Sequence, residues 1–380
     1  MNSTSSSLHA TPVTAPERIA SIDVLRGFAV LGILIVNMQG FARVSSAYMN
    51  PTSGSAFVGE EAWIWTVVYI LADTKFLSIF SMLFGAGIAM MSERHGDVLV
   101  AYALCGFLLY PLRKLNARTL LWMGGCVVAF VVPFWLLAGL SIPYWPDADR
   151  LELVAQWAPP QEVLDSEITA FRGGLGEQLA VRAPIALELQ TSAFLGLFLW
   201  RAGGLMLVGM GLYKLGVLAA ARSVVFYRRM AVIGIGTGLP LAVAGAWYKV
   251  DQGFAFETVM FQGALFNYVG SVGVFLGYIG LVMLMVQFSR LPKLTARLAA
   301  TGRMALTNYV TQSLICTLVF YGHGLGLFER VAAPGRTGIV FAIWALQLLW
   351  SPWWLKRFRF GPLEWIWRSA TYMKPQPMRV

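Results

Sequence analysis

The sequence predicts an all-α membrane protein: a bundle of about eight or nine transmembrane helices, with one short non-spanning or re-entrant apolar segment and one long external loop. Of the 380 residues, 57% are hydrophobic and only 13% are charged, whereas soluble domains carry about 25% charged residues. The apolar residues fall into many runs of about 18 or more, which is enough for a helix to cross a bilayer. The 14 Trp and 24 Phe residues are typical of a protein with aromatic belts at both interfaces.

The N-terminal part of the chain begins with a polar tail and then enters the membrane. Residues 1–17 are rich in Ser, Thr and Pro and lack a positively charged start, so we expect a disordered tail and no signal peptide. The first predicted span covers residues 22–41. The apolar stretch 62–91 is longer than one crossing requires, and Asp73 with Lys75 divides it into an interfacial or tilted front part and a spanning rear part.

The remaining apolar runs predict one short segment and six further spans. Segment 97–111 is short for a crossing and ends at Pro111, which interrupts a helix. One long polar loop, 143–188, holds eight acidic residues against three Arg and is expected to contain an amphipathic helix or two. The further spans are predicted at about 119–142, 191–217, 230–249, 265–288, 304–322 and 337–355.

Basic residues in the short connections predict the orientation of the chain, because Lys and Arg are retained on the cytoplasmic side of a membrane. The net charge of +10 therefore reflects topology, and nucleic acid is not an expected partner. Both termini and the basic connections are expected in the cytoplasm, whereas the acidic loop and the connections at 250–262 and 323–336 face outward. The basic residues concerned are Arg113, Lys114, Arg118, Lys214, Arg222, Arg228, Arg229, Arg290, Lys293, Arg297, Arg303, Lys356, Arg357 and Arg359.

This alternation of loops requires that one upstream apolar stretch does not cross. If the first two spans both cross, residue 92 lies in the cytoplasm again. The few residues up to 97 cannot recross a bilayer about 30 Å thick, because an extended residue covers at most about 3.5 Å. We therefore expect 97–111 to be re-entrant or docked against other helices, which leaves about eight crossings.

Composition and topology together divide the chain into five parts. They are a tail at 1–17, N-terminal membrane helices at 18–142, the acidic external loop at 143–188, C-terminal membrane helices at 189–360, and an interfacial cytoplasmic tail at 361–380.

Five motifs stand in order along nearly the whole chain. They are IDVLRGFAVLGILIVNM at 22–38, KFLSIFSMLFGAGIAM at 75–90, GDVLVAYALCG at 96–106, GRMALTNYVTQSLICTLVFY at 302–321 and GPLEWIWR at 361–368. Together they resemble the YeiB-like family of bacterial inner-membrane proteins, a domain of unknown function. The resemblance implies a multi-pass protein of the bacterial inner membrane. By analogy with membrane acyltransferases, it also implies acyl transfer from an acyl-CoA donor.

The chain departs from the family between the second and third motifs. Family members usually carry about two dozen more residues there, enough for one further crossing, and this apolar insert contains a histidine near its end. Here MSERHG, residues 91–96, joins the two motifs directly. The insert would supply the crossing that the charge alternation lacks. If the family's histidine is catalytic, His95 is the candidate to replace it.

Asp23 and Arg26 place an ion pair in the first turn of the first predicted span. Their i, i+3 spacing puts them on one helix face, and a helix N-terminus favours an anion. One interpretation is a capping and anchoring pair at the cytoplasmic interface. The other is a ligand site in which Arg26 binds a phosphate group and Asp23 orients it. Asn37 lies about three turns further on, and we expect it to bond to a neighbouring helix.

The sequence DTKF, residues 73–76, marks the start of the second span. Asp73 or Thr74 is expected to cap the helix that follows. Lys75 either extends toward the headgroups or meets the phosphate of a ligand such as acyl-CoA. Asp97 is expected to cap the short segment after it, with a proton relay as the alternative.

Polar residues inside two later spans are further candidates for ligand binding. Arg201 lies deep in an apolar run, so it must face the bundle interior, where it belongs either to a ligand site or to a buried pair with an acidic or carbonyl partner. Arg303, Asn308 and Gln312 fall along one side of a helix, because residues i and i+4 are neighbours. Such a polar stripe either joins packed helices or lines a substrate cavity.

Asp23, His95 and His323 are the candidates for acid–base catalysis. A histidine can act as a general base near neutral pH, although a histidine between glycines in a loop, such as His323, is more often only solvated. The chain has no zinc-ligand spacing, nucleophile elbow, phosphate loop or dinucleotide-binding glycine pattern. No metal site is predicted.

Three functions remain open on this basis, and membrane lipids are expected partners in each. An acyltransferase would take a cytoplasmic acyl-CoA donor near Arg26 and Lys75. A transporter or flippase would line the path of a small anionic or lipid-like substrate with Arg201, Asn308 and Gln312. A noncatalytic membrane component would bind a partner through the acidic loop.

Overall fold

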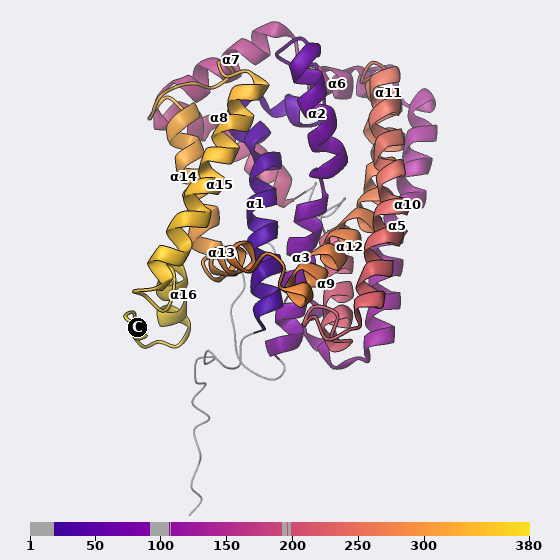
Figure 1. The fold of residues 1–380 in the computed structure, drawn as a ribbon. Helices are drawn as coiled ribbons and strands as arrows, with labels where there is room; N and C mark the ends of the chain where they lie inside the picture. Colours follow the sequence, from indigo (N-terminus) through magenta and orange to yellow (C-terminus); the bar gives the residue numbers. More distant parts are fainter. Residues whose placement is uncertain (1–18, 92–105, 107, 192–195, 197–198) are drawn as a thin grey trace, which may run out of the picture.

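The computed structural model describes residues 19–91, 106, 108–191, 196 and 199–380. Every regular element that these residues form is helical, as the sequence predicts, and the long helices run roughly along one axis (Figure 1). We call the end at which α1 begins and the C-terminus lies the lower end of the bundle, and the opposite end the upper end.

The first helices occupy the centre of the bundle. α1 (Ala20–Ala42) runs from the lower to the upper end and is followed by the short 3-10 helix η2 (Ser45–Tyr48). α2 (Gly59–Leu71) and α3 (Lys75–Met91) then return toward the lower end in one line that is broken between them. At the break Thr74 has a φ of 64°, a left-handed conformation that is rare for a β-branched residue.

The described chain resumes at the lower end with η3 (Tyr110–Lys114) and α5 (Ala117–Ser141). The Asn116 side chain caps α5, because it accepts a hydrogen bond of 2.8 Å from the Thr119 amide. α5 rises to the upper end and continues into η4 (Ile142–Tyr144).

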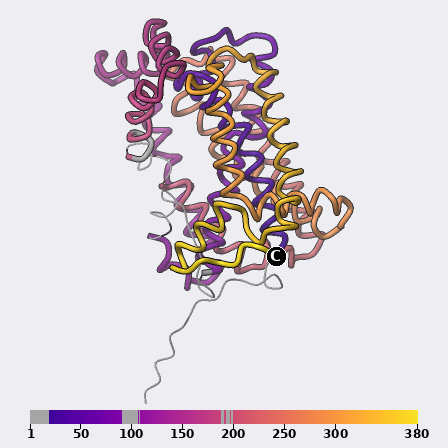
Figure 2. The backbone as a smooth tube through the Cα atoms, turned by 90° about the vertical axis from the view of Figure 1, so that its left-hand side faces the viewer, coloured from indigo at the N-terminus to yellow at the C-terminus, as the bar shows by residue number. Residues whose placement is uncertain are grey.

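The upper end carries three short helices, where the sequence predicts one or two. They are α6 (Asp147–Trp157), α7 (Gln161–Arg172) and α8 (Leu175–Gln190), and Figure 2 shows them on one side of the bundle. Phe171 fixes α7 to the membrane helices, since its ring stacks on Phe328 with 4.5 Å between centroids.

The next helices form a tightly packed group. α9 (Leu199–Lys214) descends, α10 (Val224–Asp251) ascends and α12 (Ala264–Phe288) descends again (Figure 1). A three-residue helix, α11 (Phe256–Thr258), and the π-helical turn η6 (Val259–Gly263) join α10 to α12. Glycines along α10 and α12 let the two backbones approach closely, as is usual for membrane helices.

The C-terminal helices complete the bundle. α13 (Pro292–Arg303) lies across the lower end against the start of α1. α14 (Ala305–Phe320) rises, α15 (Ala333–Leu355) descends beside it, and α16 (Pro362–Thr371) lies at the lower end.

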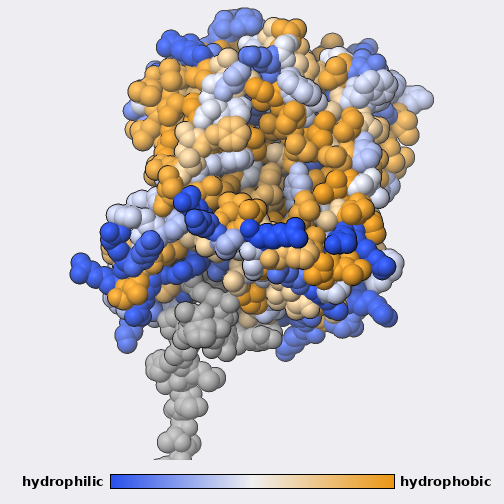
Figure 3. Space-filling view, viewed as in Figure 1, coloured by the Kyte–Doolittle hydropathy of each residue, from blue (hydrophilic) through white to orange (hydrophobic). Residues whose placement is uncertain are grey.

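Six described stretches are long and apolar enough to cross a membrane, fewer than the eight or nine that the sequence predicts. α9 and α14 have only 16 described residues each. Figure 3 shows apolar side chains over the flanks of the bundle and hydrophilic ones toward its two ends. The six stretches are Ala20–Ala42, Gly59–Met90, Ala117–Tyr144, Val224–Asp251, Phe256–Phe288 and Ala333–Leu355.

The predicted basic connections all lie at the lower end, and the acidic helices α6 and α7 lie at the upper end. The short segment 97–111 falls mostly outside the described residues. Among the described residues, Leu109 at the end of this segment and Leu112 of η3 pack against a buried cluster that contains Ile88 and Ala89 of α3, and η3 contacts α3. α3 therefore ends, and η3 begins, at the same end of the bundle.

We expect Gly238→Val to separate α10 from α12. A Cβ at Gly238 would overlap the Gly270 carbonyl oxygen, whereas Gly236, on the same helix, has no atom within 4 Å of the corresponding position. Overpacking of this kind typically costs about 1–3 kcal/mol. Thermal unfolding in detergent should show a lower melting temperature for Gly238→Val and little change for the control Gly236→Val. Equal effects of the two substitutions would contradict this packing.

Candidate functional site

The break between α2 and α3 lies near the middle of the bundle. The Phe76 ring, one residue into α3, packs directly against Gly32, which is close to the centre of the 23-residue α1. Irregular backbone at this depth has to be enclosed by protein, because lipid offers no hydrogen bonds to it. Polar side chains from α9, α10 and α12 gather around this break.

Lys75 is fully enclosed here, with a relative exposure of 0%. Its Nζ donates one hydrogen bond of 2.7 Å to the Tyr69 carbonyl oxygen in the last turn of α2, and another to Oδ1 of Asn267 on α12. The Asn267 amide in turn donates to Oδ2 of Asp73 at 2.8 Å. Lys75 therefore does not extend toward the headgroups, and Asn267 links it to Asp73.

The predicted cap of α3 is not formed by Thr74. Its hydroxyl is buried and finds no hydrogen-bond partner among the described residues. The left-handed backbone at Thr74 takes the side chain away from the usual capping geometry, in which the cap residue is extended. Instead, the Thr74 carbonyl accepts hydrogen bonds from the Ser78 amide and hydroxyl.

Arg201 of α9 lies beside the same break and faces the interior, as its position in an apolar run predicts. Its Nη1 donates to the Tyr268 carbonyl oxygen at 2.9 Å, and its Nη2 donates to the hydroxyls of Ser78, at 3.0 Å, and Ser271. The guanidinium also stacks 4.6 Å from the centroid of the Tyr268 ring. Within the described residues, these partners are all neutral, and no carboxylate pairs with Arg201.

Lys249 of α10 is a third buried cation, and sequence reasoning missed it. The predicted span ends at Lys249, which suggests an interfacial lysine, but α10 continues to Asp251 and Lys249 is only 7% exposed. Its Nζ lies 5.2 Å from the centroid of the Tyr69 ring. It makes no hydrogen bond or ion pair to any described residue.

We call Lys75, Arg201 and Lys249 the cation centre. Among the described residues, Asp73 is the carboxylate whose charge acts on all three, and it is only half-buried. Charges buried in a membrane protein are costly unless they are compensated. The centre therefore has more positive than negative charge, and an anion would balance it.

A second group of buried charges at the upper end is balanced. Arg43, just after α1, pairs with Glu61 at 3.4 Å and with Glu329 at 3.5 Å, and Arg336 of α15 pairs with Glu61. Glu61 also accepts a hydrogen bond of 3.1 Å from the Ala333 amide. Burial lowers the pKa of the Arg43 guanidinium, and the charge of Glu329 opposes this shift. We call these four charged residues the upper ion network.

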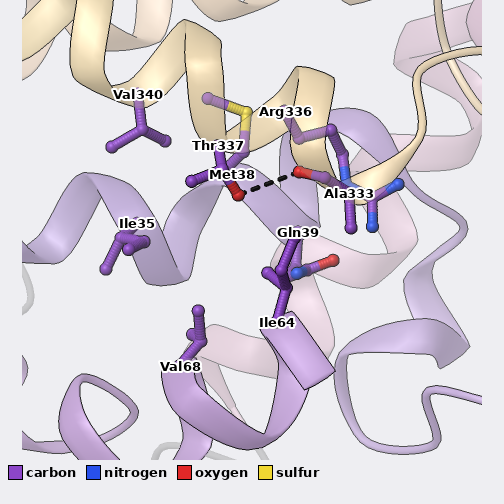
Figure 4. Close-up of a pocket in the computed structure, with 9 residues that line it drawn as sticks. All are labelled: Ile35, Met38, Gln39, Ile64, Val68, Ala333, Arg336, Thr337 and Val340. Atoms are coloured by element: carbon purple, nitrogen blue, oxygen red, sulfur yellow. Dashed lines mark hydrogen bonds between the residues drawn. The ribbon is translucent and has the colours of Figure 1, made fainter. Parts of the chain in front are cut away.

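Beside the upper ion network lies a cavity of about 10 Å³ between α1, α2 and α15 (Figure 4). This volume is about that of one water molecule. Its lining is mainly apolar, and the Thr337 hydroxyl next to it already donates to the Ala333 carbonyl oxygen at 2.8 Å. The cavity is too small for a substrate. We therefore assign the upper ion network the structural role of joining α1, α2 and α15.

Asp23 and Arg26 form an ion pair of 3.0 Å at the lower end, with side-chain exposures of 14% and 33%. They lie where α13 crosses α1, and a Cβ at Gly302 would overlap the Asp23 carbonyl oxygen. Arg26 is six residues before Gly32, so it lies about 9 Å below the cation centre along α1. The two groups are therefore separate.

The polar stripe on α14 joins helices. Asn308 donates to the Thr301 carbonyl oxygen and the Ser351 hydroxyl, both at 3.0 Å. Gln312 donates to the Val30 carbonyl oxygen at 3.2 Å and to Gln347 at 2.9 Å. These contacts connect α14 to α13, α15 and α1, as expected for a polar stripe that joins packed helices.

Two other predicted residues also take part in contacts between elements. Asn37 of α1 lies against Tyr309 of α14, as expected for a residue that bonds to a neighbouring helix. Arg303 donates a weak hydrogen bond of 3.4 Å to the Arg359 carbonyl oxygen at the lower end.

Asp23 and His323, the two predicted catalytic residues that the structure describes, lie far apart in the bundle. His323 lies at the upper end, where its Nδ1 is 2.9 Å from Oε1 of Gln178, whereas Asp23 lies at the lower end. His95 and Asp97 fall outside the described residues. The described residues contain no cluster of three or more His, Cys, Asp or Glu side chains that could hold a metal ion.

Comparison with known proteins places these features in a family. Residues 212–374 match the family described as "Protein of unknown function (DUF418)". The chain is 31% identical over 402 residues to "Uncharacterized protein YeiB" of Escherichia coli strain K12, covering 95% of this chain and 98% of that protein. It is 28% identical to "Uncharacterized protein YxaH" of Bacillus subtilis strain 168, covering 97% of each. No solved structure matches. The bacterial relatives and the apolar helices indicate a bacterial membrane protein.

We expect Glu61→Gln to destabilise the fold through the upper ion network. The substitution leaves the buried Arg43 and Arg336 with one carboxylate instead of two, and breaking a buried pair typically costs about 3–5 kcal/mol. The melting temperature should fall clearly, whereas the exposed neighbour Glu60 can be changed to Gln with little effect. A Glu61→Gln protein as stable as its Glu60→Gln control would show that the network is not needed.

Proposed function

The chain belongs to the YeiB-like family (DUF418), and we propose that it is an inner-membrane transporter or flippase that binds a small anionic substrate among its membrane helices. The observation that carries the proposal is the cation centre, in which Lys75, Arg201 and Lys249 are buried around the single carboxylate of Asp73 within the described part of the chain. An unbalanced charge at the centre of a membrane helix costs about 2.5–3.5 kcal/mol on insertion scales. A bound anion would remove this cost.

The backbone around the cation centre supports a substrate path. The break between α2 and α3 interrupts regular helix within the candidate span Gly59–Met90. Interrupted helices near the middle of the membrane are typical of transporter binding sites. The centre lies near the middle of α1, at the depth where alternating access needs a site.

The distribution of charge supports an orientation for this path. The connections rich in Lys and Arg lie together at the lower end, and such residues mark the cytoplasmic side. We therefore assign the lower end and both termini to the cytoplasm, and the acidic helices α6 and α7 to the outside. In this assignment 97–111 does not cross, because α3 ends and η3 begins on the cytoplasmic side.

We expect Arg201→Gln to reduce substrate uptake at least about tenfold, because it removes one of the three buried positive charges that attract an anion, and opposite charges about 4 Å apart attract by about 4 kcal/mol at an effective dielectric constant of about 20. The screen would first measure thermal stabilisation of the purified protein by phosphate, acetate, benzoate, succinate and citrate at fixed ionic strength. Uptake of the radiolabelled anion that stabilises most would then be measured in proteoliposomes. The control is Arg228→Gln, an exposed arginine at the lower end. Uptake that is equal in both variants would rule out a role for the cation centre.

Acyl transfer is the second candidate, because one third of the Arg26 side chain is exposed at the lower end and could meet a cytoplasmic acyl-CoA. Under this alternative, radiolabelled acetyl-CoA should transfer its label to protein or to a lipid acceptor in nanodiscs. Arg26→Ala should then abolish the transfer. If no label moves at a near-millimolar donor concentration, Asp23 and Arg26 serve as an anchor where α1 meets α13.

A further inference from the structure

Three polar groups beside the α2–α3 break make no hydrogen bond in the described part of the chain: the Thr74 hydroxyl, the Tyr69 hydroxyl and the Lys249 ammonium. Tyr69 is only 4% exposed, and its hydroxyl is buried and makes no hydrogen bond to any described residue. The Lys249 ammonium contacts the Tyr69 ring but donates no hydrogen bond to any described residue. A buried polar group without a partner is costly, so each such group needs an explanation.

The Tyr69 hydroxyl and the Lys249 ammonium both lie between α2 and α10. A Cβ on Gly245 would lie 2.9 Å from the Tyr69 hydroxyl oxygen. Gly245 and Lys249 are i and i+4 on α10, so they share one helix face. Side chains of a helix lean toward its N-terminus, which carries the Lys249 ammonium back toward Gly245 and over the Tyr69 ring. One small anion could contact both donors.

The other two members of the cation centre already have several partners. Lys75 donates to the Tyr69 carbonyl oxygen and to Asn267, and Arg201 donates to a carbonyl oxygen and two hydroxyls. Lys75 and Arg201 would therefore attract an anion mainly through their positive charge, because their N–H donors already have partners. Lys249 and the Tyr69 hydroxyl, by contrast, make no hydrogen bond to any described residue.

Aromatic rings pack beside Tyr69. Trp65 stacks on Tyr69 with 5.0 Å between centroids, and Phe57 and Phe254 meet Trp65 edge to face at 5.4 and 5.1 Å. Small-molecule sites combine such apolar walls with a few placed polar groups. A ligand whose charge is held by two donors and whose remainder is apolar would match both features.

We propose that Lys249 and Tyr69 form the binding point for the carboxylate of an organic anion with an apolar body. The ammonium would hold one carboxylate oxygen, and the Tyr69 hydroxyl would donate to the other. The inference rests on the proposed function, because it assigns the substrate contact within the cation centre. It adds the substrate class and two residues that sequence reasoning did not identify.

The test uses benzoate as the probe and neutral benzamide, which has the same shape, as the reference. Both are titrated into the purified full-length protein in nanodiscs at fixed ionic strength, and the melting temperature is followed. Benzoate should raise the melting temperature and benzamide should not. Lys249→Met and Tyr69→Phe should each weaken the apparent affinity for benzoate by about 10- to 100-fold, the usual worth of a hydrogen bond to a charged group.

The same variants give a second readout, because a binding role and a structural role predict opposite changes in the melting temperature of the ligand-free protein. Each variant removes an unsatisfied buried group, so its melting temperature without benzoate should equal or exceed that of the wild type. The control is Tyr227→Phe, whose buried hydroxyl donates to the Val217 carbonyl oxygen at 2.7 Å. This control should lower the melting temperature and leave the affinity for benzoate unchanged.

Benzoate stabilisation that survives in both Lys249→Met and Tyr69→Phe would overturn the inference. Loss of that stabilisation in Arg201→Gln alone would leave the proposed function standing and refute the binding point. If benzoate has no effect on the wild type while another anion is taken up in an Arg201-dependent manner, the substrate class is wrong. If no anion binds at all, the proposed function fails as well.

Discussion

The enclosed Lys75 side chain is the contact on which the interior of this bundle depends. Its ammonium closes the last turn of α2 through the Tyr69 carbonyl and reaches α12 through Asn267, which in turn holds Asp73. Lipid cannot hydrogen-bond to a broken helix, so the protein has to satisfy the break between α2 and α3 from within. Lys75 does so, and it thereby places a positive charge at mid-depth. Arg201 and Lys249 then lie around a centre that is already positive.

The two groups of buried charge in this protein differ in their charge balance, which indicates a structural role for one and a binding role for the other. The upper ion network combines two arginines with two glutamates and is neutral as a whole. It joins α1, α2 and α15 and borders a cavity that holds no more than about one water molecule. The cation centre has an excess of positive charge within the described residues, and its Lys249 ammonium makes no hydrogen bond or ion pair to any of them. Stability alone gives no reason to keep such groups, which is why we assign ligand binding to the centre and not to the network.

Close backbone packing gives this arrangement its shape. Glycines allow α10 to lie against α12, and Gly27 with Gly302 allows α13 to cross the start of α1. These approaches hold Lys249 against Tyr69 and place Asp23 and Arg26 beneath α13, away from the cation centre.

The fold class and the family could be predicted from the sequence, because they follow from the composition of single segments and from motifs along the chain. Run length and hydropathy identify spans, the i, i+3 spacing of Asp23 and Arg26 predicts their ion pair, and the depth of Arg201 in an apolar run predicts an interior partner. Only the tertiary structure decided which polar residues meet. In the sequence, Asn267 and Tyr69 look like ordinary span residues, and Lys249 looks interfacial because a predicted span ends there. Their contacts come from helices that are far away in sequence, so no local pattern indicates them. Conversely, Asn308 and Gln312 form a stripe that suggests a cavity, but partners on α13, α15 and α1 occupy it. Periodicity shows which face of a helix is polar, whereas only packing shows whether another protein group or a ligand satisfies that face.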